Sequence, residues 1–233
     1  MKYVKYFAQF LLAMTCFLMF KIFGANLSSN LSGKIFEFIG PFFRSKKLIK
    51  ENIKKALPDI DQLNLNKIIN LMWNNYGRIF AEYIFLKDFR YGKLASEVQI
   101  EGKEILNDIK ENNKQVIFIS GHLSNFELMA MFIEKSGINL SAIYRPLNNI
   151  FLNGIMENIR KKYICKNQIK KGLAGLKKLI KLKRKNYSSA LMIDQRVSEG
   201  ILSPLFNEKA LTTTIPADRK STRLNSSHQI ISY

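Results

Sequence analysis

The chain has 233 residues, of which 47% are hydrophobic and 24% are charged, so it can bury the core of one well-packed domain with an appendage but not the cores of two large domains. Its formal charge of +19 favours anionic partners such as nucleic acid, anionic lipid headgroups or an acidic carrier protein. The cysteines are Cys16 and Cys165 alone, which excludes a disulfide framework and a cysteine-rich metal site.

The first predicted element is an apolar N-terminal helix within residues 1–25. Its apolar run from Phe7 to Phe20 is short for a membrane span, which takes about 20 residues, but lysines and tyrosines at its ends extend the length that a bilayer accommodates. We expect a retained membrane anchor; a cleaved signal peptide and a buried core helix are the alternatives. Because Lys and Arg lie on both sides of the run, a helix in the cytoplasmic interface fits as well as a spanning helix.

A helical segment is predicted over residues 26–95. Within residues 65–85, large apolar side chains recur at the three- and four-residue spacing of a helix with one buried face. Pro58 and Asp61 mark the turn that precedes this helix. We therefore expect a helical region ahead of the core domain.

The core domain is predicted over residues 96–219, where strand and helix patterns alternate. We expect strands at residues 98–100, 115–120, 140–144 and 188–194, and helices at residues 125–137, 153–164 and 172–186. This alternation predicts an α/β fold with a largely parallel central sheet flanked by helices. In such sheets the functional side chains gather beyond the carboxyl ends of the strands, and His122, Arg145 and Asp194 each lie at or within two residues of such an end.

The stretch VIFISGHLSNFELM, residues 116–129, places His122 directly after a predicted strand and Glu127 at the start of a predicted helix. A histidine there can take a proton from a hydroxyl, and the carboxylate can orient the imidazole and stabilise its cation. Ser124 and Glu127 also fit a capping box, in which both side chains only satisfy backbone N–H groups at the helix start. The residues alone leave catalysis and capping open.

The stretch GHLSNFELM resembles the His-x4-Asp/Glu signature of the glycerolipid acyltransferase superfamily. More closely, it resembles the GH-x-x-N-W-E form of the lipid A biosynthesis acyltransferases, the lauroyl and myristoyl transferases, with Phe126 in place of tryptophan. Similar stretches follow in the same order at residues 142–149, 155–163 and 190–217. A four-residue spacing alone is common, whereas four ordered stretches make the resemblance specific.

The resemblance implies transfer of a fatty acyl chain from acyl carrier protein to a hydroxyl of an anionic lipid A precursor. The implied location is the bacterial inner membrane with the catalytic part on the cytoplasmic face, and the implied chemistry uses no metal and no organic cofactor. A lysophospholipid or another glycolipid is the alternative acceptor, because the signature does not fix it. A basic membrane-binding protein without catalysis is the alternative from another class.

Residue roles follow from the resemblance by position. His122 is the expected general base, and Glu127 is expected to orient it. Arg145 and Arg160 are expected to bind acidic substrate groups or the oxyanion formed at the thioester carbonyl. In addition, Asp194 and its neighbour Gln195 are expected to line the site at the next strand end.

A basic run extends from Arg160 to Lys185, with twelve Lys or Arg and no acidic residue. A solvated helix face and a nucleic-acid patch are alternatives for this run. The basic segments lack the interleaved aromatic residues that stack on bases, which argues against a nucleic-acid partner. Together with the apolar N-terminus, the run favours an anionic membrane or an acidic carrier protein as the partner.

The family resemblance ends near residue 217. Residues 220–233 are polar and do not continue the alternation of strands and helices. We expect a foreign extension on a truncated reading frame, so that the acyltransferase core is incomplete at its C-terminus and His228 has no functional role.

Overall fold

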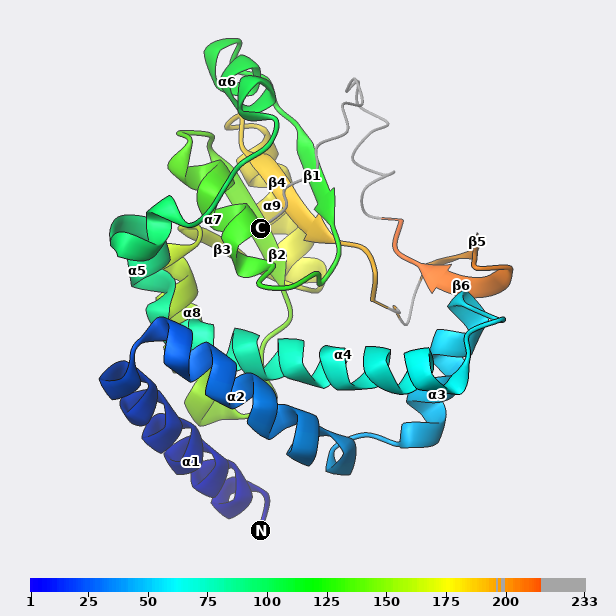
Figure 1. The fold of residues 1–233 in the computed structure, drawn as a ribbon. Coiled ribbons are helices and arrows are strands. Elements are labelled where there is room, and N and C mark those ends of the chain that lie inside the picture. The colour runs from blue at the N-terminus through cyan, green and yellow to red at the C-terminus, as the bar shows by residue number, and fades with distance from the viewer. Residues whose placement is uncertain (196, 198–199, 215–233) are drawn as a thin grey trace. The chain divides into compact units, whose positions relative to one another are not determined.

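The computed structural model describes residues 1–195, 197 and 200–214, so the expected foreign tail at residues 220–233 lies outside the described residues. The chain forms two compact units, shown with their elements in Figure 1. The sheet unit contains the described residues among 1–12, 86–197 and 213–214, and the helical unit contains those among 13–85 and 200–212.

The helical unit is built mainly from residues 13–85, in agreement with the helices expected there. Its elements are the second half of α1 (Lys2–Phe23), α2 (Ala25–Ile39), η1 (Gly40–Phe42), α3 (Lys46–Ala56), α4 (Gln62–Glu82) and η2 (Tyr83–Phe85). Helix α4 begins where expected, because the side chain of Asp61 accepts the backbone N–H of Asn64. Among the core residues between α3 and α4 are Ile49, Leu65, Ile69 and Trp73.

A hairpin of β5 (Ile201–Leu205) and β6 (Glu208–Thr212) also belongs to the helical unit. Its two-residue loop, Phe206 and Asn207, has positive φ at both positions, the conformation that matches the twist of a tight hairpin. Sequence patterns did not predict this pair of strands, since Pro204 and the loop residues interrupt any apolar alternation.

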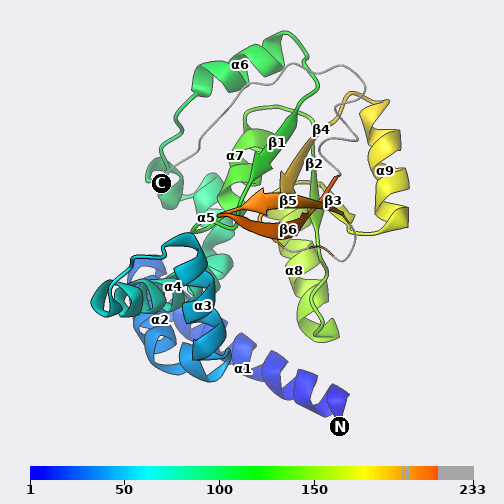
Figure 2. The same ribbon diagram turned by 90° about the vertical axis from the view of Figure 1, so that its right-hand side faces the viewer.

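The sheet unit has an α/β fold, as predicted. After α5 (Leu86–Tyr91), η3 (Lys93–Ser96) and α6 (Lys103–Glu111) come β1 (Ile117–Ser120), α7 (Glu127–Lys135), β2 (Leu140–Tyr144), α8 (Ile150–Tyr163), β3 (Asn167–Lys170), α9 (Leu173–Lys183) and β4 (Ser188–Met192). The four strands are parallel, in the order β1-β4-β2-β3. Figures 1 and 2 show α7 and α9 on opposite faces of this sheet, as right-handed crossovers require when the chain turns back from β3 to β4.

Two details of the sheet differ from the sequence prediction. The strand expected around Val98 and Ile100 is wrong, because this segment forms a turn-containing link between η3 and α6. Strand β3, Asn167–Lys170, was not expected, and it pairs with β2 at the edge of the four-stranded sheet. Helix α7 ends before Gly137 as expected, and that glycine has φ +90°, a conformation that favours glycine after a helix.

The first half of α1 packs within the sheet unit. Phe7 contacts the ring of Phe151 on α8 edge-on at 5.5 Å between centroids, and the Asn149 side-chain amide donates to the Tyr6 carbonyl at 2.8 Å. Among the described residues, α1 is the helix that is long and apolar enough to cross a membrane.

Candidate active site

The ends of β1 and β4 bring His122 and Asp194 together. The two strands are neighbours, and their register pairs Ser120 with Met192. His122 and Asp194 each follow two residues later, so the chain leaves both strands in step. The His122 Nδ1 atom lies 2.8 Å from Asp194 Oδ1, and the His122 backbone N–H donates to Asp194 Oδ2 at 2.7 Å.

A glycine makes room for this double contact. A Cβ at Gly121 would lie 3.3 Å from Asp194 Oδ2, so the missing side chain lets the carboxylate approach the backbone. Partial burial by itself raises the pKa of Asp194, but the hydrogen bonds from the backbone and imidazole of His122 outweigh it and hold that pKa below its usual value. The carboxylate is therefore ionised beside the imidazole at neutral pH.

The contact with Asp194 fixes the tautomer of His122. An ionised carboxylate only accepts hydrogen bonds, so Nδ1 carries the proton and Nε2 keeps its lone pair. The side-chain amide nitrogen of Gln195 lies 3.3 Å from Nε2, which suits donation to that lone pair. The ring of Phe126 packs edge-on against the imidazole, with centroids 4.6 Å apart. The basic nitrogen is thus Nε2, on the ring edge opposite Asp194.

Glu127 forms an ion pair with Arg160 rather than a hydrogen bond with His122. The Arg160 Nε and Nη2 atoms donate to Glu127 Oε1 at 2.8 and 2.5 Å, and both side chains are largely buried. Burial raises the pKa of Glu127 above its usual value, and the charge of Arg160 acts in the opposite direction. Among the described residues, Asp194 is the carboxylate that binds the imidazole. Glu127, in the first turn of α7, instead binds the guanidinium of Arg160 on α8.

The capping-box alternative is wrong. Helix α7 begins at Glu127, its N-cap is Phe126, and no side chain caps it. Ser124 has φ +43° and lies in the loop before the helix. The chain between His122 and Glu127 is therefore a strand-to-helix loop that presents the imidazole.

A second polar cluster supports Arg160. Its guanidinium carbon lies 5.5 Å from the centroid of the Tyr144 ring, at the end of β2. The Tyr144 hydroxyl donates a hydrogen bond to the Glu157 carboxylate on α8, and the Lys170 ammonium lies 2.9 Å from the same carboxylate. These two contacts lower the pKa of Glu157 to about 2. Sequence patterns alone did not predict a role for Tyr144, Glu157 or Lys170. The signal that was available is the position of Tyr144 and Lys170 as the last residues of two adjacent parallel strands.

Comparison with known proteins places the chain in a family. The model of the bacterial lipid A biosynthesis acyltransferases matches residues 1–226. The chain belongs to this family. It is 26% identical over 103 residues to lipid A biosynthesis acyltransferase 2 of Shigella flexneri, covering 44% of this chain and 32% of that protein. It is 22% identical over 157 residues to the lipid A biosynthesis myristoyltransferase of Escherichia coli (strain K12), covering 67% of this chain and 47% of that protein. The chain thus spans less than half the length of these relatives.

In this lipid A biosynthesis acyltransferase family member, the predicted site residues fall into three groups. His122, Asp194 and Gln195 are in direct contact, and Glu127 and Arg160 form the neighbouring ion pair. Arg145 follows β2, is exposed, and makes no ion pair or hydrogen bond within residues 1–195, 197 and 200–214. Of the two predicted site arginines, Arg160 is paired with a carboxylate, and Arg145 is not paired with any carboxylate of the described residues.

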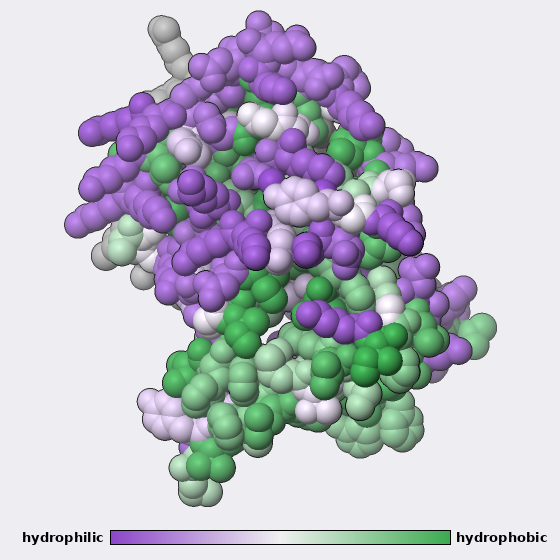
Figure 3. All heavy atoms as spheres, turned by 90° about the vertical axis from the view of Figure 1, so that its left-hand side faces the viewer, coloured by the Kyte–Doolittle hydropathy of each residue, from purple (hydrophilic) through white to green (hydrophobic). Residues whose placement is uncertain are grey.

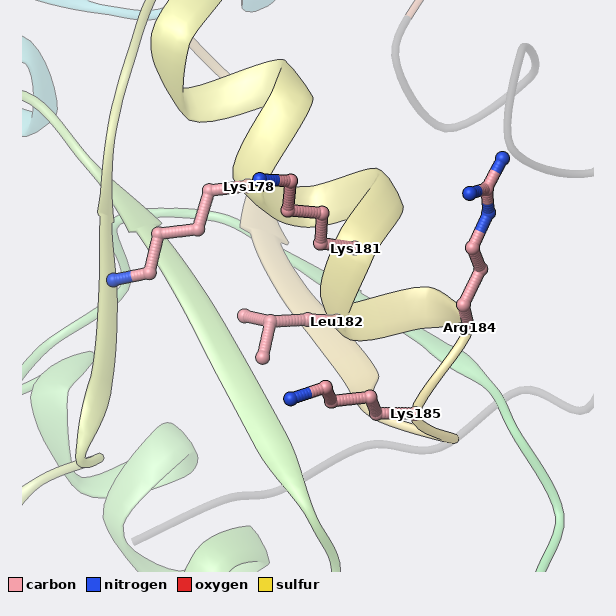
Figure 4. Close-up of a pocket in the computed structure, with 5 residues that line it drawn as sticks. All are labelled: Lys178, Lys181, Leu182, Arg184 and Lys185. Carbon is pink, nitrogen blue, oxygen red and sulfur yellow. The ribbon is translucent and has the colours of Figure 1, made fainter.

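The basic run of the family member includes an open cavity at the end of α9. It has a volume of about 310 Å³ and is lined by Lys178, Lys181, Leu182, Arg184 and Lys185, as Figure 4 shows. Four cationic side chains around one apolar side chain form a surface suited to an acidic partner with an apolar contact.

The remaining candidate groups have structural environments. Cys165 is buried, and its thiol donates to the Leu140 carbonyl at 3.1 Å. Burial raises the pKa of this thiol to about 11, so it is not a thiolate nucleophile at neutral pH. Within the described part of the chain, no three His, Cys, Asp or Glu side chains are placed to hold a metal ion.

Proposed function

We propose that this protein transfers a fatty acyl chain from acyl carrier protein to a hydroxyl of a lipid A precursor, with His122 as the general base. The observation that carries the proposal is the contact of His122 Nδ1 with Asp194 Oδ1 at 2.8 Å, at the carboxyl ends of two adjacent parallel strands. Membership of the lipid A biosynthesis acyltransferase family supports the substrate class. These two observations are independent, because the His122–Asp194 contact comes from the geometry and the family membership comes from sequence similarity.

The proposed reaction uses the Nε2 lone pair of His122, so the Gln195 amide must give way to the acceptor hydroxyl. Nε2 takes the proton of the acceptor hydroxyl, whose oxygen attacks the thioester carbonyl of the donor. The tetrahedral oxyanion collapses, the carbon–sulfur bond breaks, and the thiolate of the carrier takes the proton from His122. Asp194 keeps the proton on Nδ1 and stabilises the imidazolium that forms between the two transfers.

Arg160 and Glu127 act as one unit in this proposal. The ion pair and the Tyr144 ring hold the guanidinium of Arg160 in place, so it is proposed to stabilise the oxyanion without reorganisation. Glu127 acts on the imidazole through its charge and through Arg160. Arg145 is proposed to bind an acidic group of the acceptor, because its side chain is exposed at the end of β2.

The proposed location is the inner membrane, with the catalytic part on the cytoplasmic face. Support comes from α1, whose length and composition suit a membrane span, and from the family. The proposed surface for acyl carrier protein is the basic cavity at the end of α9 (Figure 4), because carrier and cavity have opposite charge.

The proposal is tested with His122→Ala and a control, Lys135→Ala, at the exposed end of α7. Purified variants in mixed micelles are given acyl carrier protein loaded with a fatty acid, together with either a lipid A precursor or a lysophospholipid as the acceptor. Mass spectrometry of the lipid measures transfer. We expect His122→Ala to lose about 10²- to 10⁴-fold in rate and the control to retain it. An unchanged rate in His122→Ala refutes the general base, and transfer only to a lysophospholipid refutes the acceptor.

A further inference from the structure

Helix α2 turns its small residues toward the protein and its large apolar residues outward. The buried side is made of small side chains: Ser28, Ser29, Ser32 and Gly33. The exposed side is made of large apolar side chains: Leu27, Leu31, Ile35 and Phe38. These recur at three- and four-residue spacing and so lie along one side of the helix. A surface helix of a protein surrounded by water has the reverse arrangement, with its apolar stripe facing the core.

The inner side of α2 is held by close polar contacts. The Ser32 hydroxyl donates to the Gly77 carbonyl on α4 at 2.7 Å, and a Cβ at Gly77 would lie 2.3 Å from the Ser32 carbonyl oxygen. The Ser28 hydroxyl donates to the Phe20 carbonyl at 3.0 Å. Close contact through Ser and Gly, with the large apolar side chains outside, is the way helices pack in lipid.

The exposed apolar side of α2 continues at both of its ends. We define the apolar patch as this side of α2 with exposed residues of α1 and of the segment after α2: Leu18, Met19, Ile22, Phe23, Leu27, Leu31, Ile35, Phe38, Phe42 and Phe43. Figure 3 shows apolar side chains gathered over the N-terminal helices. Large exposed apolar patches mark protein or membrane contacts.

The charges beside the patch select an anionic membrane over a second copy of the chain. Residues 24–50 carry five cationic side chains: Lys34, Arg44, Lys46, Lys47 and Lys50. Two acidic residues lie in or next to this segment. Glu37 accepts a hydrogen bond from Asn74, and Glu51 lies 4.0 Å from the Lys47 ammonium, so the net charge stays positive. Two copies joined at this patch would bring like charges together, whereas each cation near an anionic leaflet strengthens binding about fivefold.

We propose that α2 and the Phe42–Phe43 segment lie in the headgroup and acyl boundary of an anionic membrane, as a contact additional to α1. This inference rests on the membrane location proposed above. In this arrangement α2 lies parallel to the membrane surface. Its large apolar side chains face the acyl chains of the lipid, and its buried serines face α4. The membrane contact of the helical unit is thus a surface and not a single anchor helix.

The test places a fluorescent nitrobenzoxadiazole probe at single cysteines in the whole chain. Cys16 is replaced by serine, and Cys165 is 1% exposed and shielded from the reagent. Phe38→Cys reports on α2, Leu18→Cys reports on α1, and Leu63→Cys is the matched control, since position 63 is 80% exposed at the polar start of α4. The protein is reconstituted in vesicles of phosphatidylethanolamine and phosphatidylglycerol, with or without nitroxide-labelled phosphatidylcholine.

We expect nitroxide lipid to reduce the emission at positions 38 and 18 by about half or more and to leave position 63 unchanged. Quenching at 18 without quenching at 38 overturns the inference and leaves the membrane location standing. No quenching at either position overturns both. A blue shift at 38 without lipid quenching assigns the patch to a protein contact and also overturns the inference.

Discussion

The sharpest prediction concerns Asp194→Asn, because this carboxylate makes two hydrogen bonds of different kinds. One comes from the His122 backbone N–H, at 2.7 Å, and one from Nδ1, at 2.8 Å. An asparagine has one accepting and one donating end. The backbone donor cannot change, so the amide oxygen stays with it and the amide NH₂ faces Nδ1. We expect the imidazole to move its proton to Nε2, which removes the lone pair that the proposed reaction needs.

The loss of a positioned base with the right tautomer costs about 10²- to 10⁴-fold in rate, or about 3 to 5 kcal/mol at about 1.4 kcal/mol per tenfold. The assay is acyl transfer from loaded acyl carrier protein, together with ¹⁵N NMR of the imidazole. The chain has two histidines. Replacing His228 therefore leaves only the two ring-nitrogen signals of His122 to assign. The spectrum should show an Nδ1–H tautomer in the parent and an Nε2–H tautomer in Asp194→Asn.

Glu127→Gln is the matched control for the tautomer. It removes the other nearby carboxylate charge, but Glu127 makes its hydrogen bonds to Arg160 and none to the imidazole. We expect the Nδ1–H tautomer to persist in this variant, whatever its rate. A tautomer unchanged in Asp194→Asn, or a rate within about threefold of the parent, would refute the reasoning, as would a tautomer change in Glu127→Gln.

Three further predictions concern stability. Arg160→Met leaves the buried Glu127 carboxylate without its ion pair and should lower the free energy of unfolding by about 3 to 5 kcal/mol; a denaturant midpoint equal to that of the parent would contradict this. Because the pKa of Asp194 is below its usual value in the folded protein, its ionised form stabilises the fold above about pH 4 and this contribution disappears as the pH falls through the native pKa. The stability difference between the parent and Asp194→Asn should accordingly shrink as the pH falls below about 4, and a difference that does not change between about pH 5 and the acid limit of folding would argue against it. Gly77→Ala forces α4 away from α2 and should cost about 1 to 3 kcal/mol, whereas Gly154→Ala, where a Cβ meets no atom within 4 Å, should be neutral or stabilising by up to about 1 kcal/mol.

The strands that the sequence predicts are those in which apolar residues predominate. β1, β2 and β4 fall within the predicted ranges, and each has at least three apolar side chains, as is typical of parallel strands covered by helices. β3 was missed because Ile169 is its only apolar side chain and its buried Gln168 is satisfied by donating to the Cys165 carbonyl at 3.1 Å. A buried amide with a hydrogen-bond partner leaves no signal in an apolar pattern.

The position of the candidate site was predictable, but its hydrogen bonds were not. A histidine after a strand identifies the correct end of the sheet, and Asp194 was expected there as well. The sequence favours Glu127 as the partner of His122 because the two are close in the chain. The observed partner is 72 residues away, and its place depends on β4 lying beside β1. Strand order is a long-range property that a local motif does not encode.

The paired ends of β1 and β4 also determine which changes the site can tolerate. Side chains alternate across a strand, so a one-residue shift of β4 against β1 would point Asp194 to the other face of the sheet and break both of its contacts with His122. Loops far from these ends are free to gain or lose residues without such a shift. Insertions and deletions among relatives should therefore be absent between Ser120 and His122 and between Met192 and Asp194, the two short spans in which every position counts.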